Sequence, residues 1–175
     1  RPMPNHIDKY ARRGTEFHLW LENHFKHPSL ISMDDLFNQN SISPVEEDAP
    51  LDKLQSAWLS SKWANLNPVD VEVGFETMID TTLIRGRIDA VYKLDNDHYE
   101  VVDWKTGKVK SGEDLDNAGI QLAMYRLAYA KLKNIPIEKI SAAFHYVLDD
   151  QTVRPADILD EEELIKLVTQ IPIQL

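Results

Sequence analysis

The sequence has no cysteine among its 175 residues. This absence excludes a disulfide framework, a cysteine-ligated zinc site and a cysteine-ligated iron–sulfur cluster. Long apolar runs are also missing, since none approaches the roughly 20 residues that a membrane-spanning helix needs. We therefore expect neither a signal peptide nor a membrane partner, and we expect a reducing, cytoplasmic location.

The sequence also lacks an excess of positive charge. The chain carries 19 Lys and Arg against 29 Asp and Glu, which gives a formal net charge of -10. A protein that holds nucleic acid by phosphate contacts alone is usually basic, so the composition argues against a stand-alone nucleic-acid binder. It leaves open a site whose acids hold a divalent cation, because the ion supplies positive charge locally.

The length and the 43% hydrophobic content fit one globular domain over residues 1–175. Within it we expect an N-terminal helical part over 1–66, a core over 67–155 and a C-terminal helix over 156–175. The sequence begins at Arg1 and not at Met. We therefore expect a fragment of a longer protein, although processing would give the same start.

Hydrophobic periodicity predicts the order helix, helix, three strands, helix, strand, helix. The expected helices cover 8–26, 51–63, 117–133 and 160–170, the expected strands cover 69–79, 82–94 and 98–106, and 139–155 is expected to form a strand, a turn and a short return. Residues 38–50 have the composition of an exposed loop. This order predicts an α/β or α+β layered domain.

The stretch EVVDWKTG ends a hydrophobic strand with an acid and a base that are one residue apart. Side chains at i and i+2 share one face of a strand, so Asp103 and Lys105 face the same side and Trp104 faces the other. Alone, this spacing is weak, because it also arises by chance in exposed strands with a solvated ion pair.

The preceding strand contains the stretch GRIDAV. Regular alternation predicts Ile88 and Ala90 on one face and Arg87 and Asp89 on the other. If the two strands pair as a hairpin, Asp89 and Asp103 lie side by side. Two ionised carboxylates at such a short distance repel each other. A hard divalent cation, which prefers oxygen ligands, removes this electrostatic penalty.

Three further blocks accompany these two. GTEFH (14–18) lies on the first predicted helix, VEVGF (71–75) lies on the first strand, and QLAMY (121–125) lies on the helix after the Asp–Lys pair. Gln121 and Tyr125 are four residues apart, and therefore on one helix face.

The five blocks, in this order, resemble the RecB-type branch of the PD-(D/E)XK nuclease superfamily, over about residues 14–155. The stretch YEVVDWKTG with QLAMYRLAYAKL and TVRP looks most like the nuclease domains of actinobacterial UvrD-like helicase–nucleases of the AdnAB type. The resemblance implies an α/β, restriction-endonuclease-like core with a central mixed β-sheet flanked by helices.

It also implies an activity: a metal-dependent deoxyribonuclease that cuts single-stranded DNA in double-strand-break end processing and recombinational repair. The DNA would be fed by a UvrD-like helicase motor in the same chain, possibly with a second helicase–nuclease subunit. Two alternatives stay open. One is an inactive nuclease-like module that binds DNA or braces a helicase partner, and the other is a stand-alone RNA or CRISPR-associated nuclease.

The resemblance assigns roles residue by residue. The implied metal ligands for Mg²⁺ or Mn²⁺ are His18, Asp89, Asp103 and the carbonyl of Trp104, the implied catalytic residues are Asp89, Asp103, Lys105 and Glu72, and the implied DNA-binding or supporting residues are Gln121, Tyr125 and Arg87. Glu76 competes with Glu72, since both lie on one face of the same predicted strand. The four-cysteine iron–sulfur cluster of some relatives is absent.

Overall fold

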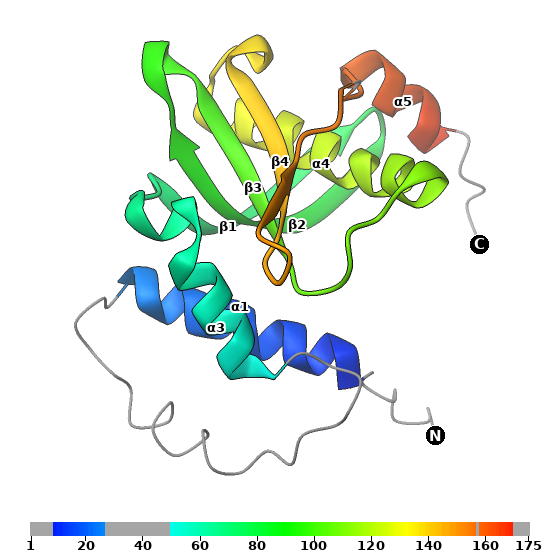
Figure 1. Ribbon diagram of the computed structural model, residues 1–175. Helices are drawn as coiled ribbons and strands as arrows, with labels where there is room; N and C mark the ends of the chain where they lie inside the picture. Colours follow the sequence, from blue (N-terminus) through cyan, green and yellow to red (C-terminus); the bar gives the residue numbers. More distant parts are fainter. Residues whose placement is uncertain (1–8, 27–49, 157, 170–175) are drawn as a thin grey trace, which may run out of the picture.

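The computed structural model describes residues 9–26, 50–156 and 158–169, and a five-stranded sheet forms its centre (Figure 1). The strand order is β1-β2-β3-β4-β5. The strands are β1 (Asp70–Ile79), β2 (Thr82–Lys93), β3 (Tyr99–Lys105), β4 (Ile140–Tyr146) and β5 (Gln151–Val153). Neighbours are antiparallel except for β3 and β4, which are parallel. The predicted mixed sheet is confirmed.

Helices cover both faces of the sheet. They are α1 (Lys9–Lys26), α3 (Leu51–Ser60), α4 (Gly112–Lys133) and α5 (Glu161–Thr169), with short 3₁₀ helices η1 (Lys62–Asn65), η2 (Asp95–Asp97) and η3 (Ile137–Lys139). In Figure 1, α1 and α3 cross below the sheet, whereas α4 and α5 lie on its other side. Within the described ranges, no helix combines the length and apolarity that a membrane span requires.

The structure shifts two predicted helix boundaries. α4 starts at Gly112 and not at residue 117, and the acids Glu113 and Asp114 occupy its first turn, where the helix dipole favours negative charge. The second helix ends at Ser60, and η1 continues the predicted segment as a tighter turn. Most of the predicted loop 38–50 lies outside the described residues.

Two hydrophobic cores lie on opposite faces of the sheet. On one face α1, α3 and η1 pack over an aromatic group that includes Trp58, Trp63, Tyr92 and Trp104. On the other face α4 covers a core that is centred on the aliphatic and aromatic residues of β2, β3 and β4. The side chain of Trp104 is 3% exposed and points away from α4, as strand alternation predicted.

Regular alternation fails within β2. Ile88 belongs to the core under α4, whereas Ala90, two residues later, belongs to the core under α1 and α3. The prediction that these two residues share a face is wrong. The physical reason lies in the pairing of β1 with β2, which includes Val71 with Ala90 and Val73 with Ile88 but omits the pair between them.

Candidate active site

The candidate site lies where β2 and β3 separate. Their ladder ends at the pair Ala90–Val102, and beyond it the last residues of β3 pair only with β4. The carboxylate of Asp89 bridges the fork, because its Oδ2 accepts a hydrogen bond of 2.8 Å from the backbone N–H of Trp104. Asp89 and Asp103 are neighbours across this fork, as the hairpin argument predicted.

Three side chains from three elements meet beside the fork. His18 of α1, Glu72 of β1 and Asp89 of β2 each offer one ligand atom, and these atoms lie within 4.8 Å of one another. His18 Nδ1 lies 3.2 Å from Asp89 Oδ1, and His18 Nε2 lies 3.1 Å from the carbonyl oxygen of Trp104. The helix α1 thereby brings the predicted histidine to the predicted acid and to the predicted backbone oxygen.

Both ring nitrogens of His18 face groups that only accept hydrogen bonds. Burial lowers the pKa of His18, but the hydrogen bond and charge of Asp89, with the charges of Asp103 and Glu72, outweigh burial and raise it. Such surroundings favour the doubly protonated ring. The acidic groups around His18 therefore favour a positive charge at this position.

Glu72 reaches this group through an unusual backbone. Its φ is 49°, in the left-handed region that a glutamate rarely adopts. Burial, followed by the charge of Asp89, raises the pKa of its carboxyl group. The side chain of Glu76 is instead exposed, between the buried residues Phe75 and Thr77, and pairs with Arg85 at 2.8 Å. The structure therefore brings Glu72, and not Glu76, to His18 and Asp89.

Asp103 lies beside the three-residue group and is not part of it. Its residue is 6% exposed, and Lys105 Nζ lies 2.8 Å from Oδ2 without the direction of a well-formed hydrogen bond. Burial raises the pKa of Asp103, the charge of Asp89 raises it further, and Lys105 opposes the shift. The ammonium of Lys105 faces this oxygen, and the role of Asp103 as a metal ligand stays a prediction.

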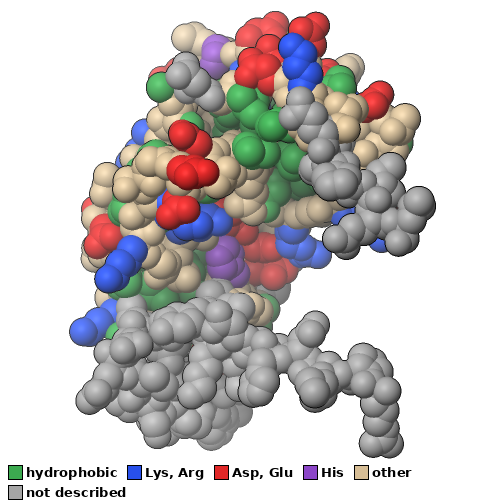
Figure 2. Space-filling model, turned by 90° about the vertical axis from the view of Figure 1, so that its right-hand side faces the viewer, with side chains coloured by type: hydrophobic (Ala, Val, Ile, Leu, Met, Phe, Trp, Pro, Cys, Tyr) green, Lys and Arg blue, Asp and Glu red, His purple; other side chains and the backbone are tan. Residues whose placement is uncertain are grey.

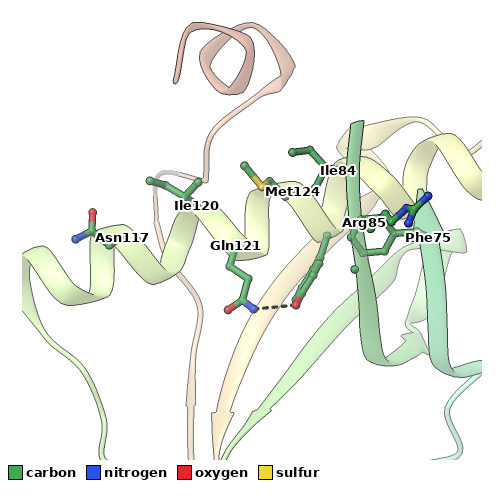
Figure 3. Close-up of a pocket in the computed structure, with 9 residues that line it drawn as sticks. Phe75, Ile84, Arg85, Asn117, Ile120, Gln121 and Met124 are labelled. Carbon is green, nitrogen blue, oxygen red and sulfur yellow. Dashed lines mark hydrogen bonds between the residues drawn. The ribbon is translucent and has the colours of Figure 1, made fainter. Parts of the chain in front are cut away.

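A chain of polar contacts holds Lys105. Gln121 Oε1 accepts a hydrogen bond of 3.2 Å from Lys105 Nζ, and Gln121 Nε2 donates one of 2.8 Å to the hydroxyl of Tyr125. Figure 3 shows the second bond between the two α4 side chains. Their common helix face was predicted from the spacing of four residues. The lysine is thus held between a carboxylate on its own strand and an amide on α4.

Arg87 lies at the edge of the site. Its guanidinium is 3.7 Å from Glu72 Oε2, and its side chain is 61% exposed. A contact of this length in water contributes little to stability. Because the side chain is largely exposed, its guanidinium remains accessible to a phosphate. The predicted role of Arg87 in DNA binding is not tested by this geometry.

Two residues that support Tyr125, Phe75 and Gly86, were not predicted to have a role. The rings of Phe75 and Tyr125 meet edge to face, with centroids 5.7 Å apart. A Cβ atom at Gly86 would lie 2.6 Å from Phe75 Cζ, so only glycine lets the Phe75 ring lie over β2 at this position. Phe75 lies in the block VEVGF and Gly86 in the block GRIDAV. Their contact joins two strands and a helix, so sequence spacing alone does not reveal it.

The donor set fits a hard divalent cation. One imidazole nitrogen, the carboxylates of Glu72 and Asp89, and the Trp104 carbonyl supply the nitrogen and oxygen ligands that Mn²⁺ and Mg²⁺ accept. On the face shown in Figure 2, acidic and histidine side chains gather between basic ones. The arrangement can hold a metal and present a lysine beside it.

Comparison with known proteins supports a nuclease relationship. The model of the family described as the PD-(D/E)XK nuclease superfamily matches residues 2–172. None of the curated proteins matches the chain significantly. One solved structure, described as "Crystal structure of SSO0001", matches with 21% identity and a TM-score of 0.43, over 89% of this chain and 83% of that one. A likeness this distant carries no argument about function.

Proposed function

The chain belongs to the PD-(D/E)XK nuclease superfamily, and from this membership we propose that it hydrolyses phosphodiester bonds of single-stranded DNA with Mg²⁺ or Mn²⁺ as its cofactor. The single observation that supports this best is the meeting of His18, Glu72 and Asp89 beside the Asp103–Lys105 pair. A site for a cation and a lysine that can reach a phosphate are the two parts that metal-assisted phosphodiester hydrolysis needs.

Four side chains and one backbone oxygen would hold the metal: those of His18, Glu72, Asp89 and Asp103, and the Trp104 carbonyl. When bound, a divalent metal activates water and neutralises charge on a phosphate. Asp89 also fixes the strand fork through the Trp104 N–H, so the ligand and the carbonyl keep one spacing. Preorganised ligands of this kind lose little conformational freedom on binding.

Lys105 would stabilise the negative charge that develops on the phosphate oxygens. The side chain of Lys105 is 28% exposed, so it is both supported by Asp103 and open to a substrate. Gln121 directs the ammonium through its Oε1, and Tyr125 fixes Gln121 in turn. Arg87, at the edge, would contact a neighbouring phosphate.

We place the chain in the RecB-type branch of the superfamily, as part of a helicase–nuclease that processes DNA breaks in the cytoplasm. The net charge of -10 supports this placement, because an acidic nuclease domain needs another source of DNA affinity. A UvrD-like motor in the same protein, or in a partner subunit, would deliver the single strand and supply that affinity.

The test is cleavage of a labelled single-stranded DNA with Mn²⁺, with Mg²⁺ or with EDTA. We expect cutting only with the metal, and we expect Lys105→Ala to lose it by roughly 100-fold or more. Lys139→Ala removes an exposed lysine far from the site and is the matched control, with wild-type activity expected. Equal cutting by wild type and Lys105→Ala would contradict the assigned lysine.

If the protein does not cut DNA, calorimetry distinguishes an intact metal site that needs its motor from an inactive nuclease-like module. Titration of Mn²⁺ into the wild type and into Asp89→Asn measures the metal site without any substrate. Binding that the variant loses would indicate an intact site that needs its motor. Absence of binding in the wild type would contradict the metal-dependent nuclease and leave an inactive nuclease-like module.

A further inference from the structure

An apolar groove adjoins the candidate site. Its volume is about 350 Å³, and it lies between α4 and the β1–β2 pair (Figure 3). Its lining consists of Phe75, Ile84, Arg85, Gly86, Asn117, Ile120, Gln121, Met124 and Tyr125. The catalytic roles proposed above use Gln121 and Tyr125 but leave the apolar part of this lining without a function.

Gln121 belongs to both the groove and the site. Its amide oxygen holds the ammonium of Lys105, which would face the reacting phosphate, while its side chain also lines the groove. A ligand that touches Lys105 and enters the groove therefore needs a phosphate and an apolar part that are close together. A nucleotide has this construction, with one sugar between the phosphate and the base.

Two packed aromatic rings border the groove, of which Phe75 is buried and Tyr125 is half-buried. The Phe75 and Tyr125 rings meet at an interplanar angle of 77°, and the Tyr125 hydroxyl is held by Gln121. Gly86 leaves the space that the Phe75 ring occupies, since a Cβ there would be 2.6 Å away from it. Rigid aromatic and aliphatic surfaces bind bases of any sequence, because every base has an apolar π-face.

We propose that this groove binds one unstacked base of the DNA strand, next to the phosphate that lies at Lys105. The inference rests on the proposed nuclease function and adds the place of the base to it. A volume of about 350 Å³ is at the lower end of the range of roughly 300–1,000 Å³ for small-ligand sites. One base fits this size, whereas an amphipathic helix of a protein partner needs a longer apolar surface.

Two polar side chains of the lining have no catalytic role: Arg85, which pairs with Glu76, and Asn117, whose amide lies at the exposed rim of the groove. An amide both donates and accepts hydrogen bonds, so it can pair with the edge of any base. The groove therefore selects for the presence of a base and not for its identity. Unstacked bases occur in single strands, which agrees with the proposed substrate.

The experiment measures binding and not cleavage. Fluorescence anisotropy gives the affinity for a labelled thymidine strand, and for the same strand with all bases replaced by abasic sugars, with Ca²⁺ in place of Mg²⁺. For the wild type we expect removal of the bases to weaken binding roughly 5- to 150-fold. Met124→Trp fills the groove and should bind the intact strand about as weakly as the wild type binds the abasic one.

Two further variants complete the design. Leu132→Trp adds the same ring to an exposed position of α4 outside the groove, and it should behave like the wild type. Asn117→Trp covers the groove from its exposed rim and replaces Met124→Trp if that variant does not fold. A base dependence of equal size in the wild type and in both groove variants would overturn the proposal and leave the groove to a protein partner.

The proposed nuclease function fails by a different readout, which is the absence of both metal-dependent cutting and Mn²⁺ binding. Base-dependent DNA binding without cutting and without Mn²⁺ binding would keep the groove and contradict the nuclease. Cutting without base-dependent binding would keep the nuclease and contradict the groove. A wild type that binds neither strand would overturn the groove as a base site.

Discussion

Glu72 and Asp89 lie opposite each other in β1 and β2, at the one position between Asp70 and Ile79 where the ladder omits a pair. The omission coincides with the left-handed backbone of Glu72 and with the reversal of side-chain alternation in β2. Backbone strain of this kind costs about 1–3 kcal/mol and persists where the surrounding structure imposes it. Here the same residue that breaks the ladder supplies a candidate metal ligand.

The first prediction concerns Glu72→Asn. Asparagine tolerates a left-handed backbone better than glutamate does, and it removes a charge that faces Asp89. We expect the free energy of unfolding in EDTA to stay equal or to rise by up to about 1 kcal/mol. We expect the Mn²⁺ affinity to fall by more than roughly 10-fold, because one ligand is lost. Urea unfolding and calorimetry measure the two quantities.

Glu76→Asn is the matched control on the same strand. Its exposed pair with Arg85 contributes less than about 1 kcal/mol, and it lies outside the three-residue group. Its Mn²⁺ affinity should equal that of the wild type. A larger loss of metal at Glu76 than at Glu72 would reverse the assignment between the two glutamates.

The second prediction separates positioning from metal binding. Gln121→Leu removes the acceptor of Lys105 Nζ and should lower the cleavage rate roughly 10- to 100-fold, because the lysine loses its direction. The Mn²⁺ affinity should not change. Gln121→Glu keeps an oxygen for the lysine and should retain more activity than Gln121→Leu. Equal rates for both variants would show that the amide oxygen does not position Lys105.

The third prediction concerns the ion pair between Glu100 of β3 and Arg154. Glu100 is 2% exposed, and Arg154 binds both of its carboxylate oxygens, at 2.8 and 2.9 Å. Arg154→Met leaves a buried carboxylate without its positive partner and with the hydrogen bond from the Ser141 hydroxyl. We expect a loss toward the lower end of about 3–5 kcal/mol in urea unfolding, since half of the arginine side chain is exposed.

The double variant Glu100→Gln with Arg154→Met should recover part of that loss, because no unpaired charge remains. Arg85→Met, at the exposed pair with Glu76, is the matched control and should cost less than about 1 kcal/mol. If the double variant is as unstable as the sum of both single variants, the buried pair is not coupled as its geometry indicates.

The fourth prediction is a pH dependence of stability at His24. This ring stacks on Trp20 with centroids 5.5 Å apart and meets Trp58 edge to face, and burial lowers its pKa below the ordinary value of 6.5. The unfolded chain therefore binds the proton more readily than the folded one. The contribution of His24 is complete above about pH 6.5 and is lost as the pH falls below 6.5 and through the lower pKa of the folded chain.

His24→Phe keeps an aromatic ring and removes the titration. Thermal unfolding between about pH 7.5 and 5.5 should show a steeper loss of stability for the wild type than for this variant. Identical slopes would mean that the ring is protonated equally well in the folded and unfolded chain.

Alternation and helix spacing predicted the parts of the site that lie within one regular element. Asp103 and Lys105 share a face, and Gln121 contacts Tyr125, because both pairs follow the period of an unbroken strand or helix. The face of Ile88 and Ala90 was mispredicted because alternation assumes a continuous ladder. The break depends on a backbone angle of Glu72 that no spacing in the sequence encodes.

The early start of α4 escaped prediction for a related reason. The residues around Gly112 are small, acidic or amide-bearing, which also describes a loop. The later turns of α4 pack against the sheet, and the acids of the first turn interact favourably with the helix dipole, so this segment is helical. The parallel pairing of β3 with β4 likewise rests on a long crossover, and for that feature the family resemblance was more informative than the local pattern.

His18 reaches the fork from α1, and Trp20 and Phe25 of α1 contact Trp58 of α3, which in turn meets Trp104 of β3. The predicted core 67–155 contains all five strands, but it lacks this ligand and the helices that cover Trp104. The smallest transferable nuclease unit is therefore larger than its sheet. A chimaera that exchanges only the strands and α4 between two such proteins would lack His18 of the candidate metal site, so we expect a functional graft to need α1 and α3 as well.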